Sequence, residues 1–216
     1  MYVTDKPDRS RLEYLWPLIL SDGRLIRVKS PGLPARKSLF VDPYKGLVPF
    51  MAFARAGDAG ALAIWNVDRF ERPVKAVISP SDVEGIKGER FAVHEYFSGE
   101  LTTLGLEEEM EVRLQGWDVK LCSVAPIVDG FAAIGLANKY VSPATVDSVN
   151  REGGQVRVIL AEAGRFKAYC ALEPKEVSAD GAEIESKSFD SATGALTVEL
   201  IKIPGSSGPV TVEIEL

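Results

Sequence analysis

The stretch Lys29–Pro43, KSPGLPARKSLFVDP, decides how this 216-residue chain is organised. It holds three prolines and one glycine, which exclude a helix and disfavour a strand because proline fixes φ and lacks a backbone N–H. A short helix-like segment lies ahead of it, and nearly everything after it has the pattern of strands. We therefore predict that residues 25–47 form a Pro-rich connection between two different architectures.

The composition is that of a folded protein, with 46% hydrophobic and 26% charged residues, and the length allows one large domain or two small ones. The net charge of −6 argues against a nucleic-acid partner, since such partners require a concentrated basic surface. The basic residues that do lie close together are interpreted as a solvated connection: Arg24, Arg27, Lys29, Arg36 and Lys37.

No apolar run approaches the roughly 20 residues that cross a bilayer, and no charged leader with an apolar core opens the chain. Cys122 and Cys170 lie far apart, each within a strand-like run, so we expect buried thiols rather than a disulfide. These features predict a cytoplasmic protein without a membrane partner.

The N-terminal part reads as a strand, residues 1–5, followed by a helix from Asp8 to Trp16 that Pro17 ends. One face of this helix is apolar and needs a partner; it consists of Leu12, Leu15, Trp16 and Ile19. A lone strand and helix ahead of an all-β chain indicate the last unit of a truncated domain, residues 1–24.

Short apolar runs broken by turn residues recur about every ten residues from Val48 onward, as in sandwiches and barrels. After a short strand at Leu25–Val28, the predicted strands are Pro49–Ala56, Gly60–Val67, Val74–Ile78, Phe91–Phe97, Met110–Leu114, Val119–Val124, Phe131–Leu136, Gln155–Ala161, Arg165–Ala171, Ala195–Ile203 and Val210–Leu216.

Several of these runs alternate between apolar and polar residues, which indicates one buried and one wet face. Val156, Val158 and Leu160 oppose Gln155 and Arg157, for example. The predicted fold class is therefore all-β: a two-sheet antiparallel β-sandwich over residues 48–216.

No catalytic signature is visible among these residues. His94, the one histidine, has no clustered ligands beside it and is interpreted as having a structural or surface role. The acidic run Glu107–Glu109 lacks the spacing of a calcium loop and is read as a solvated turn. Gly153 and Gly154 predict a hairpin turn rather than a phosphate loop. We accordingly expect no cofactor and no metal.

Three aromatic residues are candidates for stacking on sugar rings if they are exposed: Trp65, Trp117 and Tyr44. Packing in the core is the preferred interpretation for Trp65, which lies in an apolar strand.

An ordered set of motifs resembles one family. The motifs are Tyr2-Val-Thr-Asp-Lys-Pro, Leu18-Ile-Leu-Ser-Asp-Gly-Arg-Leu-Ile-Arg, Pro31-Gly-Leu-Pro-Ala-Arg, Leu39-Phe-Val-Asp-Pro, Ile64-Trp-Asn-Val-Asp, Phe91 to Leu101, Ser123-Val-Ala-Pro-Ile and Phe131-Ala-Ala-Ile-Gly-Leu. They resemble the raffinose synthase, seed-imbibition and alkaline α-galactosidase group of glycoside hydrolase family 36. The likeness runs from Tyr2 to about Val149, and residues 150–216 match no motif.

This resemblance implies that residues 1–24 are the last βα unit of a (β/α)8 barrel and that the remainder is its C-terminal β-sandwich. The family's two catalytic aspartates lie on earlier barrel strands, which are absent here, so we expect no catalytic residue. Asp5, at the end of the last barrel strand, is the one candidate for binding an α-galactoside; the alternative is that it caps the turn that follows.

Three functional hypotheses remain. The first is an accessory domain that packs on a catalytic barrel acting on α-galactosides and stabilises it. The second is a free-standing carbohydrate-binding module, and the third, an independent hydrolase, is disfavoured. We also expect self-association of the chain through the apolar helix face.

Overall fold

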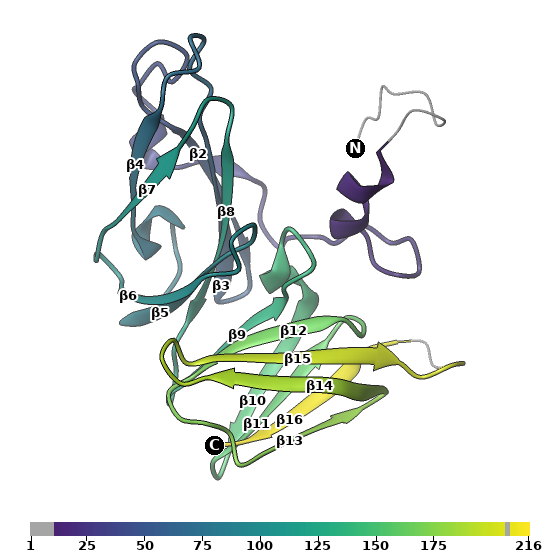
Figure 1. Cartoon of the computed structure of the whole chain (residues 1–216). Helices are drawn as coiled ribbons and strands as arrows, with labels where there is room; N and C mark the ends of the chain where they lie inside the picture. Colours follow the sequence, from purple (N-terminus) through teal and green to yellow (C-terminus); the bar gives the residue numbers. More distant parts are fainter. Residues whose placement is uncertain (1–10, 206–207) are drawn as a thin grey trace.

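The computed structural model describes residues 11–205 and 208–216. Its described part is built from antiparallel sheets, which confirms the all-β fold class predicted from the sequence. The strands gather into two lobes (Figure 1). We call β1 to β8, residues 33–126, the first lobe, and β9 to β16, residues 131–215, the second lobe. The predicted domain limits at residues 24 and 47 stay predictions.

The first lobe combines a six-stranded sheet, in the order β1-β2-β3-β8-β5-β6, with the two-stranded pair β4-β7. Its strands are β1 Leu33–Pro34, β2 Phe50–Ala56, β3 Ala59–Trp65, β4 Val74–Ile78, β5 Arg90–Glu95, β6 Leu101–Gly105, β7 Met110–Leu114 and β8 Val119–Pro126. The pair β4-β7 covers one face of the large sheet, and the first core lies between them.

The second lobe consists of two four-stranded sheets, β10-β11-β16-β13 and β14-β15-β12-β9. Its strands are β9 Phe131–Leu136, β10 Val146–Glu152, β11 Gln155–Leu160, β12 Arg165–Cys170, β13 Glu176–Asp180, β14 Ala182–Asp190, β15 Ala195–Lys202 and β16 Val210–Glu215. The two sheets pack face to face around a second core. The sheet-on-sheet packing expected from the alternating patterns is therefore present.

The alternating runs bury the faces that the sequence predicts. Val156, Val158 and Leu160 lie in the second core, opposite Phe166 and Ala168 of the other sheet. Burying each large apolar side chain stabilises the fold by about 1.5–3 kcal/mol. These inward faces are the main source of stability in both lobes.

The eleven strands predicted from Pro49 onward are all present, with ends that match the prediction or shift by one or two residues. Five further strands were not predicted: β1, β6, β10, β13 and β14. Each of these lies at the edge of its sheet.

The helix predicted from Asp8 to Trp16 is not present in the described part. Two short 3-10 helices, η1 Leu12–Tyr14 and η2 Trp16–Leu18, replace it. Pro17 cannot donate the backbone hydrogen bond that a continuous helix needs there. The strand predicted at Leu25–Val28 is also wrong, because only an isolated bridge forms between Ile19 and Leu25. The strand predicted at residues 1–5 lies outside the described residues.

Three more 3-10 helices occur between strands: η3 Arg36–Ser38, η4 Pro80–Asp82 and η5 Ser142–Thr145. No helix in residues 11–205 and 208–216 is long and apolar enough to cross a membrane.

Candidate functional site

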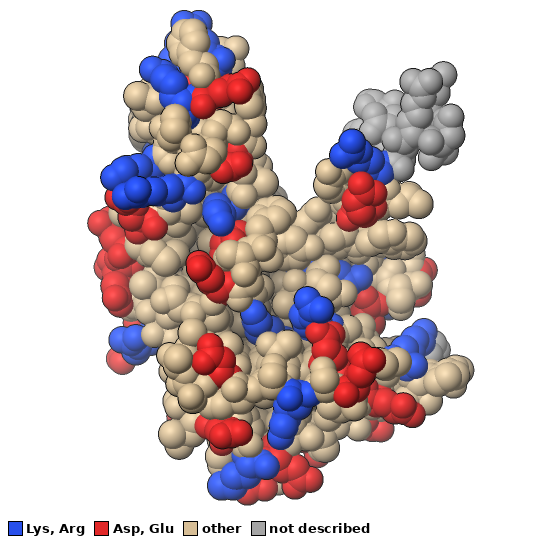
Figure 2. Space-filling view, in the orientation of Figure 1, with Lys and Arg blue, Asp and Glu red and all other residues tan. Residues whose placement is uncertain are grey.

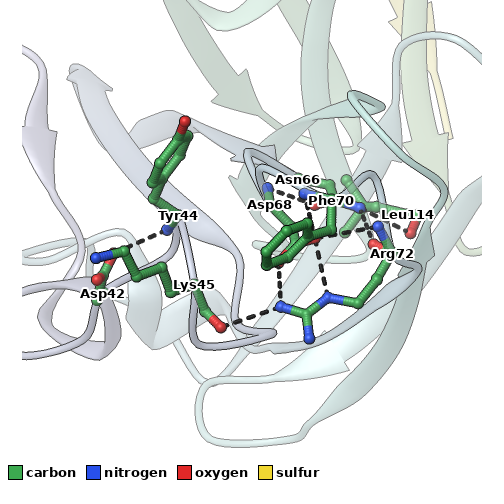
Figure 3. Close-up of polar contacts among 8 residues, drawn as sticks. All are labelled: Asp42, Tyr44, Lys45, Asn66, Asp68, Phe70, Arg72 and Leu114. Atoms are coloured by element: carbon green, nitrogen blue, oxygen red, sulfur yellow. Dashed lines mark hydrogen bonds and ion pairs between the residues drawn. The ribbon is translucent and has the colours of Figure 1, made fainter.

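Three loops meet at the end of the first lobe that lies farthest from the second lobe (Figure 1); we call residues 42–47, 66–72 and 115–118 the loop end. The buried amide of Asn66 ties them together. Its Nδ2 donates to the carbonyl oxygens of Arg72 and Gln115, both at 2.8 Å. Its Oδ1 accepts from Asp68 N at 3.0 Å; Figure 3 shows the contacts with Arg72 and Asp68. One side chain thus fixes two of the three loops.

Asp68 is the centre of the loop end and is fully buried. Its carboxylate accepts from Arg72 Nη2 at 2.6 Å and from the backbone N–H groups of Phe70 and Arg72 at 3.0 and 3.1 Å. The hydrogen bond from the Arg72 side chain is the main reason why the pKa of Asp68 falls to about 2. Arg72 Nη2 also donates to the Lys45 carbonyl at 3.1 Å (Figure 3), which attaches the third loop.

The backbone of the loop end is strained. Leu47, Glu71 and Trp117 have φ of 55°, 58° and 61°, a left-handed region that non-glycine residues rarely adopt. Gly116 permits the loops to touch, because a Cβ there would lie 2.7 Å from the Glu71 Cβ. Such strain collects at functional sites and persists only where surrounding contacts enforce it.

The loop end exposes three aromatic rings, those of Tyr44, Phe70 and Trp117. The Arg69 guanidinium lies 4.3 Å from the centroid of the Phe70 ring, so an approaching ligand would find that ring partly covered. Tyr44 and Trp117, two of the sugar-stacking candidates, are at least half exposed. The third, Trp65, is half-buried and packs on Phe50, with ring centroids 5.6 Å apart.

The segment 11–21 is anchored on the second lobe by a buried ion pair. Lys139 Nζ lies 2.9 Å from Glu162 Oε1, and both side chains are about nine-tenths buried. Glu162 Oε2 accepts from Ser21 N, and Lys139 Nζ donates to the Ile19 carbonyl, both at 2.5 Å. Because each charge also holds backbone of the segment, the pair fixes the position of residues 16–21.

Beyond this anchor the segment exposes apolar side chains. Leu12, Tyr14 and Trp16 are each more than half exposed, so two of the four residues of the predicted apolar face, Leu12 and Trp16, are well exposed. Leu15 and Ile19 are only partly exposed.

A notch separates this segment from the first lobe (Figure 2). The Tyr140 N–H donates to the Pro17 carbonyl at 3.1 Å. The Tyr140 ring contacts that of Tyr96 on the first lobe, with centroids 5.0 Å apart. The notch has one wall from the first lobe and one wall from residues 11–19, and contacts through Tyr96 and Tyr140 connect the two.

His94 is buried between the lobes, where its Nδ1 has no hydrogen-bond partner. It faces away from the first core, which contains its neighbours Phe91 and Val93, as the alternation predicts. Burial, assisted by the charge of Lys167, lowers its pKa to about 4. The geometry shows no catalytic partner beside it among the described residues, in keeping with a structural role.

The other predicted positions within residues 11–205 and 208–216 form no site. Asp5 lies outside the described residues. Glu107 accepts a hydrogen bond from Ser81 Oγ at 2.9 Å, and Glu108 accepts one from Gly105 N at 2.8 Å. Within the part of the chain that the structure describes, no three His, Cys, Asp or Glu side chains gather as metal ligands.

The two cysteines are unpaired and buried, as predicted. Burial raises the pKa of each thiol to about 12, which makes them unreactive. Gly153 and Gly154 form the turn between β10 and β11, again as predicted.

The sequence analysis missed the Asp68–Arg72 and Lys139–Glu162 pairs. The spacing of Asn66 and Asp68 directly after an apolar strand is typical of side chains that hydrogen-bond a turn. This spacing was the sequence signal available for the Asp68–Arg72 pair. The second pair carries no local signal.

Comparison with known proteins gives one family. A family model described as raffinose synthase or seed imbibition protein Sip1 matches residues 1–77 and 71–200. A probable galactinol-sucrose galactosyltransferase 6 of Arabidopsis thaliana is 28% identical over 94% of this chain and 31% of its own length. The galactinol-sucrose galactosyltransferase of Oryza sativa subsp. japonica is 30% identical over 93% of this chain and 29% of its own.

A stachyose synthase of Pisum sativum is 24% identical over 86% of this chain and 25% of its own length. The chain therefore spans less than a third of these curated relatives.

Proposed function

Since this chain belongs to the raffinose synthase and seed imbibition protein family, we propose that it is a non-catalytic C-terminal β-sandwich domain. In this proposal it packs on, and stabilises, a catalytic (β/α)8 barrel that acts on α-galactosides. The buried, unpaired cysteines fit a cytoplasmic protein. Asp5 remains the proposed point of contact with the sugar.

One observation carries the proposal: Leu12, Tyr14 and Trp16 are exposed on a segment that the Lys139–Glu162 pair holds firmly against the second lobe. Exposed apolar residues on a fixed backbone are typical of a surface that another protein covers. The relatives' length outside the match supplies a partner of sufficient size.

The test compares three proteins in galactosyl transfer from galactinol to sucrose. They are the 216-residue chain alone, the rice relative without its matched region, and that truncated relative fused to this chain. We expect activity only in the fusion. Fusion to an unrelated β-sandwich is the control and should remain inactive. Turnover by the chain alone would show that it carries a catalytic site and would overturn the proposal.

The alternative function is carbohydrate binding at the loop end. The observation that favours it is the exposure of Tyr44 and Trp117 on strained loops that Asp68 holds in place, because rigid exposed rings offer flat apolar surfaces to sugars. Affinity electrophoresis in gels containing a galactomannan tests it. Retardation of the chain, abolished in Trp117→Ala and retained in Trp16→Ala, would support the binding module; equal mobility with and without the polysaccharide would contradict it.

A further inference from the structure

The outer face of the six-stranded sheet, opposite the first core, is apolar along β2, β3 and the first half of β8. Further along, the polar side chains of Ser123 and His94 lie on the same face. Strand register places Phe50, Trp65 and Val119 side by side in one row across β2, β3 and β8. The next row on this face consists of Ala52, Ala63 and Leu121. We call these six residues the outer rows.

The same face continues into the contact between the lobes. Further along β8, β5 and β6, Ala125, Ala92 and Leu101 are buried against Ala132 and Ile134 of β9. The part of the sheet face that the second lobe covers is thus an established, mainly apolar interface, in which His94 is also buried. The outer rows extend this interface beyond the second lobe.

The outer rows are only half-buried and contain no charged side chain. The second lobe shows how a solvated sheet face differs: Arg157 of β11 lies beside Glu213 of β16 on the outside of its sheet, and their side chains form an exposed ion pair. Antiparallel sheets normally present such polar side chains to water. The absence of charged side chains from the outer rows therefore indicates that another protein covers this part of the sheet.

The outer rows form the first-lobe wall of the notch. Tyr96, which follows β5, donates its backbone N–H to the Leu121 carbonyl at 2.8 Å. The Tyr96 ring contacts the Tyr140 ring, and the Tyr140 N–H donates to the Pro17 carbonyl. The opposite wall carries the exposed Leu12, Tyr14 and Trp16. Figure 2 shows that the space between the two walls is open.

We propose that the outer rows are the surface on which the catalytic barrel docks. Part of the barrel then occupies the notch, between the sheet face and residues 11–19. This inference rests on the proposed function and adds to it the surface of contact. Two observations select this partner: the outer rows continue an existing interface, and residues 11–19 make the facing wall. A partner that presents aliphatic side chains on both of its sides fits this notch.

The experiment mixes the 216-residue chain with the part of the rice relative that lies outside the match. Hydroxyl-radical footprinting then compares the free and the mixed chain. We expect at least threefold slower oxidation of Phe50, Trp65 and Leu121, with no change at Phe70 of the loop end.

A pair of variants tests the same surface by affinity. Ala63→Glu places a charge in the outer rows and should weaken binding at least tenfold, since a buried charge without a partner is costly. Val77→Glu, on the exposed side of β4, is the matched control and should bind like the unmodified chain. Unfolding midpoints verify that both variants fold. If a variant does not fold, the footprint of the unmodified chain alone tests the proposed surface.

The outcomes separate the two proposals. Binding with protection only outside the outer rows overturns this inference and leaves the proposed function standing. Protection of the outer rows in the chain alone, lost on dilution, identifies a second copy as the occupant and also overturns it. No association at all contradicts the proposed function and the inference with it.

Discussion

His94 lies in the contact between the lobes, and its Nδ1 has no hydrogen-bond partner among the described residues. The charged groups that act on it are Lys167 of β12, which disfavours protonation, and Glu95, which favours it. Lys167 is fixed there, because its Nζ donates to the Gly99 carbonyl at 2.8 Å. A proton on His94 would place a second positive charge in this buried contact.

We expect acid to weaken the folded state through His94. Its native pKa of about 4 lies below the ordinary value of 6.5, so the unfolded chain takes up the proton first and stability falls from about pH 6.5 down to pH 4. When the pH falls from 7.5 to 5, the free energy of unfolding of the unmodified chain should decrease by about 2 kcal/mol more than that of the His94→Gln variant. Urea unfolding at both pH values measures this difference; equal losses would contradict it.

A second prediction for single residues concerns the Lys139–Glu162 pair. Glu162→Gln leaves a buried ammonium without its counterion, which typically costs about 3–5 kcal/mol. The segment 11–21 should also loosen, so that trypsin cleaves after Arg24 faster than in the unmodified chain. Glu213→Gln, in an exposed pair with Arg157, is the control and should change stability by less than about 1 kcal/mol. Unaltered cleavage at Arg24 would show that the pair does not anchor the segment.

Among the elements, central and edge strands behave differently. Central strands such as β11 and β12 are flanked on both sides and bury every second residue, so their sequences alternate. The edge strand β14, AEIESKSFD, is largely exposed and carries charges that blunt an unpaired edge. Its sequence therefore lacks the alternation on which strand prediction depends.

The contribution of a central strand can be measured at Phe166. This ring is fully buried in the second core, so Phe166→Ala should lower the free energy of unfolding by about 3–5 kcal/mol. Leu172→Ala, at a side chain that is 74% exposed, should stay within about 0.5 kcal/mol. Similar losses in both variants would argue against a tightly packed second core.

At the scale of the whole molecule, the exposed residues of the N-terminal segment predict self-association. Without a covering partner, burial of Leu12 and Trp16 against a second copy would contribute about 1.5–3 kcal/mol for each side chain. Light scattering should show a mass that rises with concentration, and Trp16→Glu should reduce this rise, whereas Phe70→Glu should not. A strictly monomeric chain at high concentration would refute the prediction.

The sequence by itself determined the all-β class, the central strands and their buried faces, because a period of two is written locally in each strand. It also identified the family, through motifs in a fixed order. The tertiary structure alone decided the edge strands, the loop end and the contact of Lys139 with Glu162. It likewise turned Phe50, Trp65 and Leu121 into one surface. These features depend on which distant segments become neighbours, and that information lies in the packing of the whole chain rather than in any one stretch.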